Sequence, residues 1–195
     1  MNKALNQNLY FVKEHVGIFK AANNYDIFDP GTQQLVLECR EENLGFFTKL
    51  FRFSDYKRMT PFEIIIRTAS GEKVLTVKRG ISIFLSKVQV FDENDTLVGL
   101  FKQKFFSIGG KFDVLDASEK VVCTLKGKWT GWDFRFMKDD QELAHVAKKW
   151  SGFGKELFTT ADNYMLEIDS RVPANNPVRL LILAAVMSID MVLKE

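Results

Sequence analysis

Lysine and arginine residues recur along the chain at positions from which they could together bind a negatively charged surface. Each group follows the second member of a pair of short apolar segments. The set comprises Arg40, Lys78, Arg79, Lys102, Lys104, Lys126, Lys128, Lys148 and Lys149. A cation near an anionic membrane leaflet contributes about 1 kcal/mol to binding, so several on one surface could hold a protein there reversibly. Alternatively, lysines at strand ends keep a protein soluble and protect sheet edges from pairing.

Residue patterns typical of catalysis are absent from the sequence. The two histidines, His15 and His145, and the two cysteines, Cys39 and Cys123, are not neighbours along the chain. No glycine-rich phosphate loop, nucleophile elbow or zinc-ligand spacing occurs. We therefore expect a protein without catalytic residues or a cofactor. Because the N-terminus lacks the apolar core of a signal peptide and two cysteines make no disulfide framework, we also expect a cytoplasmic location.

Composition indicates one globular domain, comprising residues 1–195. The chain is 46% hydrophobic and 27% charged, which excludes a disordered chain. Its aromatic residues are 18 Phe against four Tyr and three Trp, and since Phe cannot hydrogen-bond, they predict a large apolar interior. The net charge of +2 and the lack of an aromatic stacking motif argue against a nucleic-acid partner.

Alternating apolar segments joined by polar turns predict five β-hairpins. The paired segments are 25–28 with 35–37, 62–66 with 74–77, 88–91 with 97–100, 112–115 with 121–125, and 134–136 with 143–146. Residues 9–12, 17–19, 155–159 and 164–168 could add further strands, to a total of roughly twelve. The fold class predicted is mainly β, with the strands closed into an antiparallel barrel.

Acidic residues gather in the turns within these hairpins. They are Asp29, Glu72, Asp92, Glu93, Asp95, Asp116, Asp139 and Asp140. In an up-and-down barrel the hairpin turns share one end and the connections between hairpins share the other. We therefore predict one acidic end and one basic end.

Residues 178–193 predict a helix that is buried on every side. Pro177 suits the first turn of a helix, and the following run is apolar nearly all round, which requires burial in protein or in lipid. The residues expected in its core are Leu180, Leu181, Ile182, Leu183, Val186 and Ile189. Only ten uncharged residues separate Arg179 from Asp190, about 15 Å of helix, whereas a bilayer core needs about 30 Å. A helix in the centre of the barrel is therefore favoured over a membrane-spanning one.

Four segments resemble the phospholipid scramblase-like and LURP-one-related proteins. The most specific is WSGFGKELFTTADNY at 150–164, and the others are YDIFDPG at 25–31, RMTPFEI at 58–64 and IDMV at 189–192. The resemblance extends from about Leu9 to Glu195. It implies the tubby C-terminal fold, a twelve-stranded barrel around a central hydrophobic helix. It also implies binding to anionic phospholipid, including phosphoinositide head groups, at the inner face of a membrane.

The same resemblance implies a degenerate calcium loop at 160–171. Its candidate ligands are Thr160, Asp162 and Tyr164. Calcium prefers several oxygen ligands with carboxylates among them, and of these three only Asp162 is a carboxylate. The alternative is an ordinary β-strand preceded by a polar turn.

Three functions are open at this point. The first is a monomeric module that binds anionic phospholipid at a membrane surface. The second is a scramblase that moves lipids between leaflets, which requires a polar path through the bilayer and hence an oligomer or a large rearrangement. The third is a structural or ligand-binding barrel without membrane contact.

Overall fold

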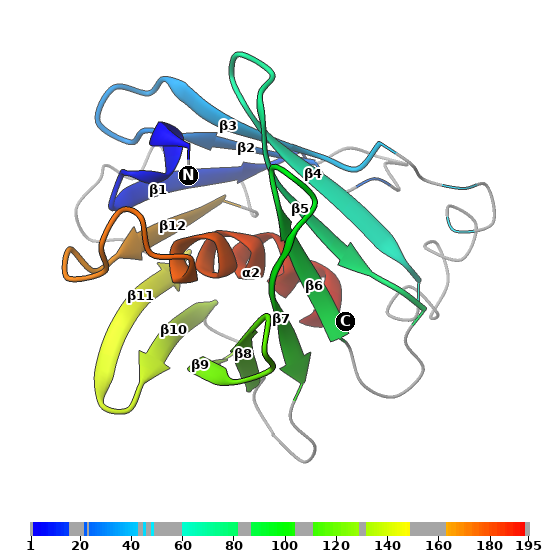
Figure 1. Cartoon of the computed structure of the whole chain (residues 1–195). Helices are drawn as coiled ribbons and strands as arrows, with labels where there is room; N and C mark the ends of the chain where they lie inside the picture. The colour runs from blue at the N-terminus through cyan, green and yellow to red at the C-terminus, as the bar shows by residue number, and fades with distance from the viewer. Residues whose placement is uncertain are drawn as a thin grey trace.

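Twelve antiparallel strands close into a barrel in the computed structural model (Figure 1). The structure describes residues 2–15, 22, 24–42, 45, 48, 60–81, 87–103, 111–128, 132–148 and 163–193. The strands are β1 (Leu9–Glu14), β2 (Tyr25–Phe28), β3 (Leu35–Arg40), β4 (Phe62–Thr68), β5 (Lys73–Arg79), β6 (Lys87–Asp92), β7 (Leu97–Gln103), β8 (Phe112–Asp116), β9 (Val121–Lys128), β10 (Asp133–Lys138), β11 (Gln141–Ala147) and β12 (Asn163–Ile168). Each strand pairs with its neighbours in the sequence, and β1 closes the barrel by pairing with β12.

The five predicted hairpins and the two outer strands β1 and β12 are confirmed. Strand β4 shows why the pattern predicts them: its residues alternate between buried and half-buried along all seven positions, as one face of the sheet packs inward. The further strands expected at 17–19 and 155–159 lie outside the described residues.

The acidic turn residues have a local role in closing the hairpins. Asp29 accepts hydrogen bonds at Oδ1 from the backbone of Gly31 and Thr32, both at 2.8 Å. Asp92 and Asp116 accept equivalent bonds from the backbone of their own turns. Aspartate is common in turns for this reason. Backbone N–H groups of the turns therefore stabilise part of the negative charge at this end of the barrel.

Helix α2 (Val178–Leu193) runs through the interior of the barrel (Figure 1). All six residues predicted for its core are buried, with exposures from 0% at Ile182 to 6% at Leu180. Asn176 caps the helix, since its Oδ1 accepts the Val178 N–H at 3.0 Å. The central helix implied by the resemblance is thus confirmed. Among the described residues, no helical segment combines the length and apolar character needed to cross a bilayer.

Arg179, in the first turn of α2, is fully buried and fastens the helix to the N-terminal segment. Its Nε donates to the Leu5 carbonyl at 2.9 Å and its Nη1 to the Val172 carbonyl at 2.8 Å. Its Nη2 donates to the Gln7 carbonyl and to Asn8 Oδ1. Within the described part of the chain, no carboxylate forms an ion pair with it. Carbonyl and amide oxygens of the described residues accept its hydrogen bonds, and the Tyr10 side chain also interacts with it.

Candidate functional site

The two ends of the barrel differ in the segments that they carry. Strand order places the turns within the hairpins at one end, here called the hairpin end, and the links between hairpins at the other, the connection end. Six predicted cations lie in or directly after the parts of their strands nearest the connection end, namely Arg40, Lys78, Arg79, Lys102, Lys126 and Lys148. Lys128 belongs to the end of β9, and Lys104 and Lys149 lie outside the described residues.

Lys102 and Lys126 are the exposed cations of this set. Register pairs Lys102 with Lys87 across β6 and β7, and Lys126 with Arg135 across β9 and β10. Like charges directly opposite one another destabilise a sheet. Lys87 and Arg135 are each offset by a carboxylate, at 3.1 Å and 2.8 Å, whereas neither Lys102 nor Lys126 makes an ion pair with any described residue. On its other side, across β7 and β8, Lys102 lies opposite Asp113.

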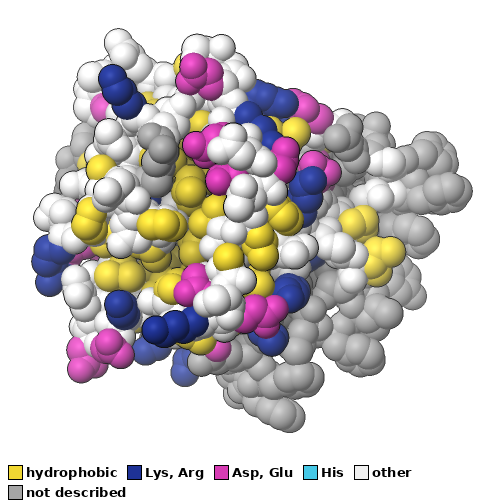
Figure 2. Space-filling view, viewed as in Figure 1, with side chains coloured by type: hydrophobic (Ala, Val, Ile, Leu, Met, Phe, Trp, Pro, Cys, Tyr) yellow, Lys and Arg dark blue, Asp and Glu magenta, His cyan; other side chains and the backbone are white. Residues whose placement is uncertain are grey.

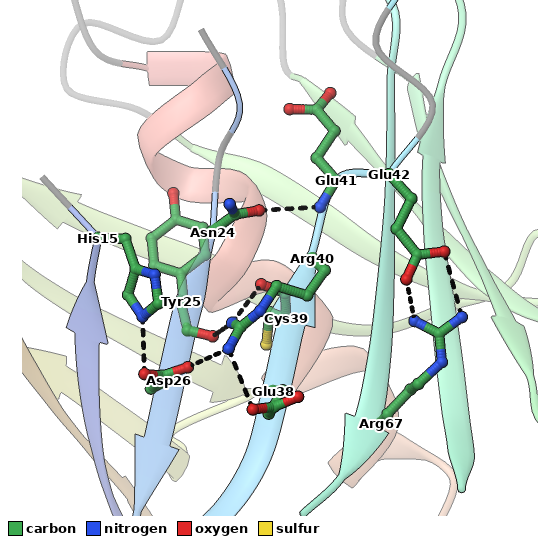
Figure 3. A network of polar contacts seen from close by, with 10 residues as sticks. All are labelled: His15, Asn24, Tyr25, Asp26, Glu38, Cys39, Arg40, Glu41, Glu42 and Arg67. Carbon is green, nitrogen blue, oxygen red and sulfur yellow. Dashed lines mark hydrogen bonds and ion pairs between the residues drawn. The ribbon is translucent and has the colours of Figure 1, made fainter. Parts of the chain in front are cut away.

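Arg40 is committed to contacts within the protein (Figure 3). Its Nη1 donates to the Tyr25 carbonyl at 2.7 Å, and its Nη2 to Asp26 Oδ1 at 2.6 Å. His15 Nε2 lies 2.6 Å from the other oxygen of Asp26, so the network joins β2 and β3 to the end of β1. Burial favours a raised pKa for Asp26, but the hydrogen bonds from His15 and Arg40 outweigh it and hold the pKa below its usual value.

Arg79 was predicted as an exposed cation, and this is wrong. The side chain is 3% exposed, its guanidinium lies 4.8 Å from the centre of the Phe62 ring, and its Nη2 donates to the Thr60 carbonyl at 2.6 Å. Successive residues of a strand face opposite sides of the sheet. Arg79 therefore faces inward, while its neighbour Lys78 faces outward and pairs with Glu63 at 3.1 Å.

Lys148 lies against aromatic rings. Its Nζ is 4.3 Å from the Trp132 ring and 5.4 Å from the Tyr164 ring, and these two rings stack with their centres 5.0 Å apart. A cation over ring faces is stabilised by their electron density. Lys148 is consequently half-buried and has a packing role.

Tyr164 lies in a β-strand, which is the alternative that the sequence analysis weighed against a calcium loop. It belongs to β12, pairs in register with Val12 and is 2% exposed. Thr160 and Asp162 lie outside the described residues. Over the described ranges, no group of three or more His, Cys, Asp or Glu side chains could hold a metal ion.

Two residues of the connection end were missed by the sequence analysis. Lys87 begins a strand rather than following one, so it fell outside the pattern that selected the others. Ile81 is the second residue after β5 and is 77% exposed, although it belongs to a residue type that is usually buried. A single apolar residue produces no periodic pattern in the sequence, so the exposure of Ile81 could be learned only from the structure. The connection end thus exposes an apolar side chain as well as lysines.

Comparison with known proteins identifies the family. The scramblase family model matches residues 5–195, nearly the whole sequence. The chain therefore belongs to the scramblase family.

Three curated relatives are between 23% and 28% identical to the chain over the aligned residues. Human phospholipid scramblase family member 5 is 28% identical over 51% of the chain, and human phospholipid scramblase 2 is 23% identical over 76%. A phospholipid scramblase family protein of Schizosaccharomyces pombe is 23% identical over 82%. The matched regions make up 42%, 53% and 44% of these relatives, so the chain spans about half their length.

The fold also has a counterpart among solved structures. The X-ray structure of an Arabidopsis thaliana protein matches with a TM-score of 0.52 and 17% identity, covering 93% of this chain and 90% of the other. At this identity the likeness concerns the fold alone.

Proposed function

We propose that the connection end binds anionic phospholipid at a membrane surface. The observation that carries the proposal is the pair of exposed lysines, Lys102 and Lys126, which form no ion pair within the described part of the chain. Cations held near an anionic leaflet are attracted to it, and this attraction weakens with salt because mobile ions screen exposed charges.

Ile81 supports the same orientation. An exposed apolar side chain at the same end of a protein as exposed lysines is typical of surfaces that rest in the interfacial region of a bilayer. Its side chain would enter the head-group layer while the lysines contact phosphates. The protein would then bind peripherally, at the cytoplasmic leaflet, where anionic lipids are concentrated.

The names of the relatives support phospholipid as the ligand. One human relative is named phospholipid scramblase 2 and another phospholipid scramblase family member 5, and transfer of that ligand to this chain is part of our proposal. Binding by charge and by one apolar contact requires no bond to form or break, so we assign the site no catalytic residue. Phosphoinositides, which carry extra phosphate groups, would engage both lysines.

Vesicle flotation tests the proposal with two matched variants. The test variant carries Lys102→Glu and Lys126→Glu at the connection end. The control carries Lys120→Glu and Lys138→Glu, which reverse two exposed cations at the hairpin end and change the net charge equally. Vesicles of phosphatidylcholine alone are compared with vesicles containing phosphatidylserine, or phosphoinositide at equal total charge.

We expect wild type to float with anionic vesicles only, and to dissociate as salt rises. Reversing both lysines should reduce partitioning at least about tenfold, since each cation contributes about 1 kcal/mol, while the control changes it less than about twofold. Equal losses in the two variants, or an absence of binding at low salt, would contradict the proposal. Stronger binding to phosphoinositide at equal charge would identify the preferred head group.

A further inference from the structure

A pocket of about 420 Å³ opens at the hairpin end, opposite the proposed membrane-binding end. The first turn of α2 and the link from β12 to α2 form one side, and strands β7, β9 and β11 form the other. In Figure 1 this link, the β10–β11 turn and the first turn of α2 lie on the same side of the barrel. The apolar side chains used in the argument are Val98, Val122, Leu143, Val172, Val178 and Leu181.

This pocket exposes apolar surface. Figure 2, drawn from the same side, shows hydrophobic side chains gathered in the middle of this face with charged side chains around them. Val121, beside the lining residue Val122, is 51% exposed. Exposed apolar surface that is hollowed and bordered by polar groups is typical of a ligand site. Ligand pockets commonly measure about 300–1,000 Å³, so this volume suits one small or single-chain ligand.

The charges around the pocket favour an anion. Lys138 lines it, is exposed, and makes no ion pair with the described residues. Arg179 lies behind the wall: its Nη1 donates to the carbonyl of the lining residue Val172, and its buried charge has no carboxylate partner in the described ranges. A buried charge is screened less than an exposed one. The positive end of the α2 dipole adds to this potential at the same place.

The carboxylate in the lining is already engaged. Asp116 Oδ1 accepts hydrogen bonds from the Ser118 backbone and hydroxyl at 2.9 and 2.6 Å, and from the Lys120 backbone at 3.0 Å. Arg171, also in the lining, pairs with Asp169. Asp139 and Asp140 follow Lys138 in an exposed turn, which makes a cationic head group the competing occupant.

We propose that this pocket binds a single-chain amphiphile with an acidic head group. The hydrocarbon chain would lie against Val98, Val122 and Leu143, and the head group would accept hydrogen bonds from Lys138 Nζ. Each methylene removed from water strengthens such binding about fourfold. The site lies at the other end of the barrel and does not depend on the membrane-binding proposal.

Methyl NMR of the whole chain, without vesicles, tests this directly. The probes are dodecanoate, dodecyl phosphate and dodecyltrimethylammonium, each titrated below its micelle concentration. Either acidic probe should shift the methyl signals of Val98, Val122 and Leu143 in a saturable way, and the stronger of the two identifies the head group. The Ile81 methyls, at the connection end, should not shift, and the cationic probe should bind at least about fivefold more weakly.

Two variants and a control show where the head group and the hydrocarbon chain of the probe lie in the pocket. Lys138→Gln should weaken the acidic probe about fivefold, the effect of losing one partly exposed ion pair, and Lys120→Gln should leave it unchanged. Val122→Trp should abolish binding by filling the pocket. If this variant fails to fold, the methyl shifts of the wild type still decide the question.

Three outcomes would overturn the proposal. They are an absence of shifts at the three lining residues with both acidic probes, binding of the cationic probe as tight as that of the acidic ones, and equal loss in the Lys138 and Lys120 variants. Shifts that depend on protein concentration without any probe would mean that a second copy of the chain covers the pocket, and would equally overturn it. None of these results bears on vesicle binding by the connection end.

Discussion

The contacts of Asp26 show how one carboxylate can join three strands at the connection end. It receives Arg40 on one oxygen and His15 on the other, each at 2.6 Å, and its side chain is 20% exposed. Because Arg40 is held in this way, it strengthens the barrel and is not available to a ligand. The proposed membrane-binding surface therefore does not include Arg40.

This network predicts a pH-dependent contribution to stability. The pKa of Asp26 is lower in the folded protein than its ordinary value of 3.8. The carboxylate thus stabilises the fold at pH values above 3.8, and this contribution is lost as pH falls through the folded-state pKa. Asp26→Asn should lower the free energy of unfolding by about 1 kcal/mol at pH 7, and the deficit should narrow below pH 3.8.

Urea unfolding of wild type and variant at pH 7 and pH 3 measures the effect. Asp140→Asn, at an exposed turn position, removes the same charge and serves as the control. It should change stability little at either pH. A deficit for Asp26→Asn that stays constant with pH would count against the ionic network.

At the residue scale, burial was the property that the sequence predicted least well. Residues 74–77 of β5 are all buried, so no polar side marks which way Lys78 and Arg79 face. Arg79 was consequently predicted as exposed. The burial of Arg179 could not be predicted either. Two of its carbonyl partners, Leu5 and Gln7, lie more than 170 residues away in the sequence.

At the scale of elements, the position of α2 depends on a glycine in the barrel wall. A Cβ added at Gly99 of β7 would lie 2.1 Å from the Leu115 carbonyl oxygen and 3.1 Å from Leu181 Cδ2. Strand β8 and the helix thus both approach this point too closely for a side chain. Glycine is found in strands where another backbone comes this near.

Gly99→Ala should therefore destabilise the protein, by about 1–3 kcal/mol as for other overpacked cores. Gly80→Ala is the matched control, because a Cβ there would have no atom within 4 Å, and it should be neutral. Thermal unfolding followed by circular dichroism compares the two. A Gly99 variant as stable as the Gly80 variant would show that the helix does not pack against β7 in this way.

The elements themselves could be predicted because two independent signals agreed. Turn residues marked the ends of each hairpin while apolar alternation marked its strands, and the length of the apolar run after Pro177 favoured a helix inside the barrel over one that spans a membrane. The partners across the barrel could not be predicted, since β1 meets β12 through contacts between opposite ends of the chain. The placement of residues 1–195 in one domain stays a prediction.

For the whole molecule, we propose that the two ends of the barrel bind different ligands, a membrane surface at the connection end and a single amphiphile at the hairpin end. The acidic turns lie at the hairpin end, and the two exposed lysines of the proposed site lie at the connection end. The separation of charge is incomplete, because Glu119 of the β8–β9 turn pairs with Lys87 at 3.1 Å and Lys73 pairs with Asp95 at 2.6 Å. Exposed lysines that form no ion pair with described residues lie at both ends, Lys102 and Lys126 at the connection end and Lys138 at the hairpin end, and our proposal assigns membrane binding to the first pair.

The two native cysteines make the orientation of the barrel measurable. Cys39 and Cys123 are both buried. Burial raises the pKa of the Cys39 thiol and raises that of Cys123 to about 12, which protects both from labelling reagents. A nitroxide can therefore be placed selectively at Ile81→Cys on the connection end or at Ala117→Cys on the hairpin end, both exposed positions.

Electron paramagnetic resonance depth measurement of these two labels on phosphatidylserine-containing vesicles tests the central claim most directly. We predict that the label at position 81 becomes accessible to oxygen dissolved in the bilayer and shielded from an aqueous nickel reagent, while the label at position 117 stays in water. A label at position 117 that enters the bilayer while the one at 81 stays in water, or two labels that both stay in water, would contradict the account.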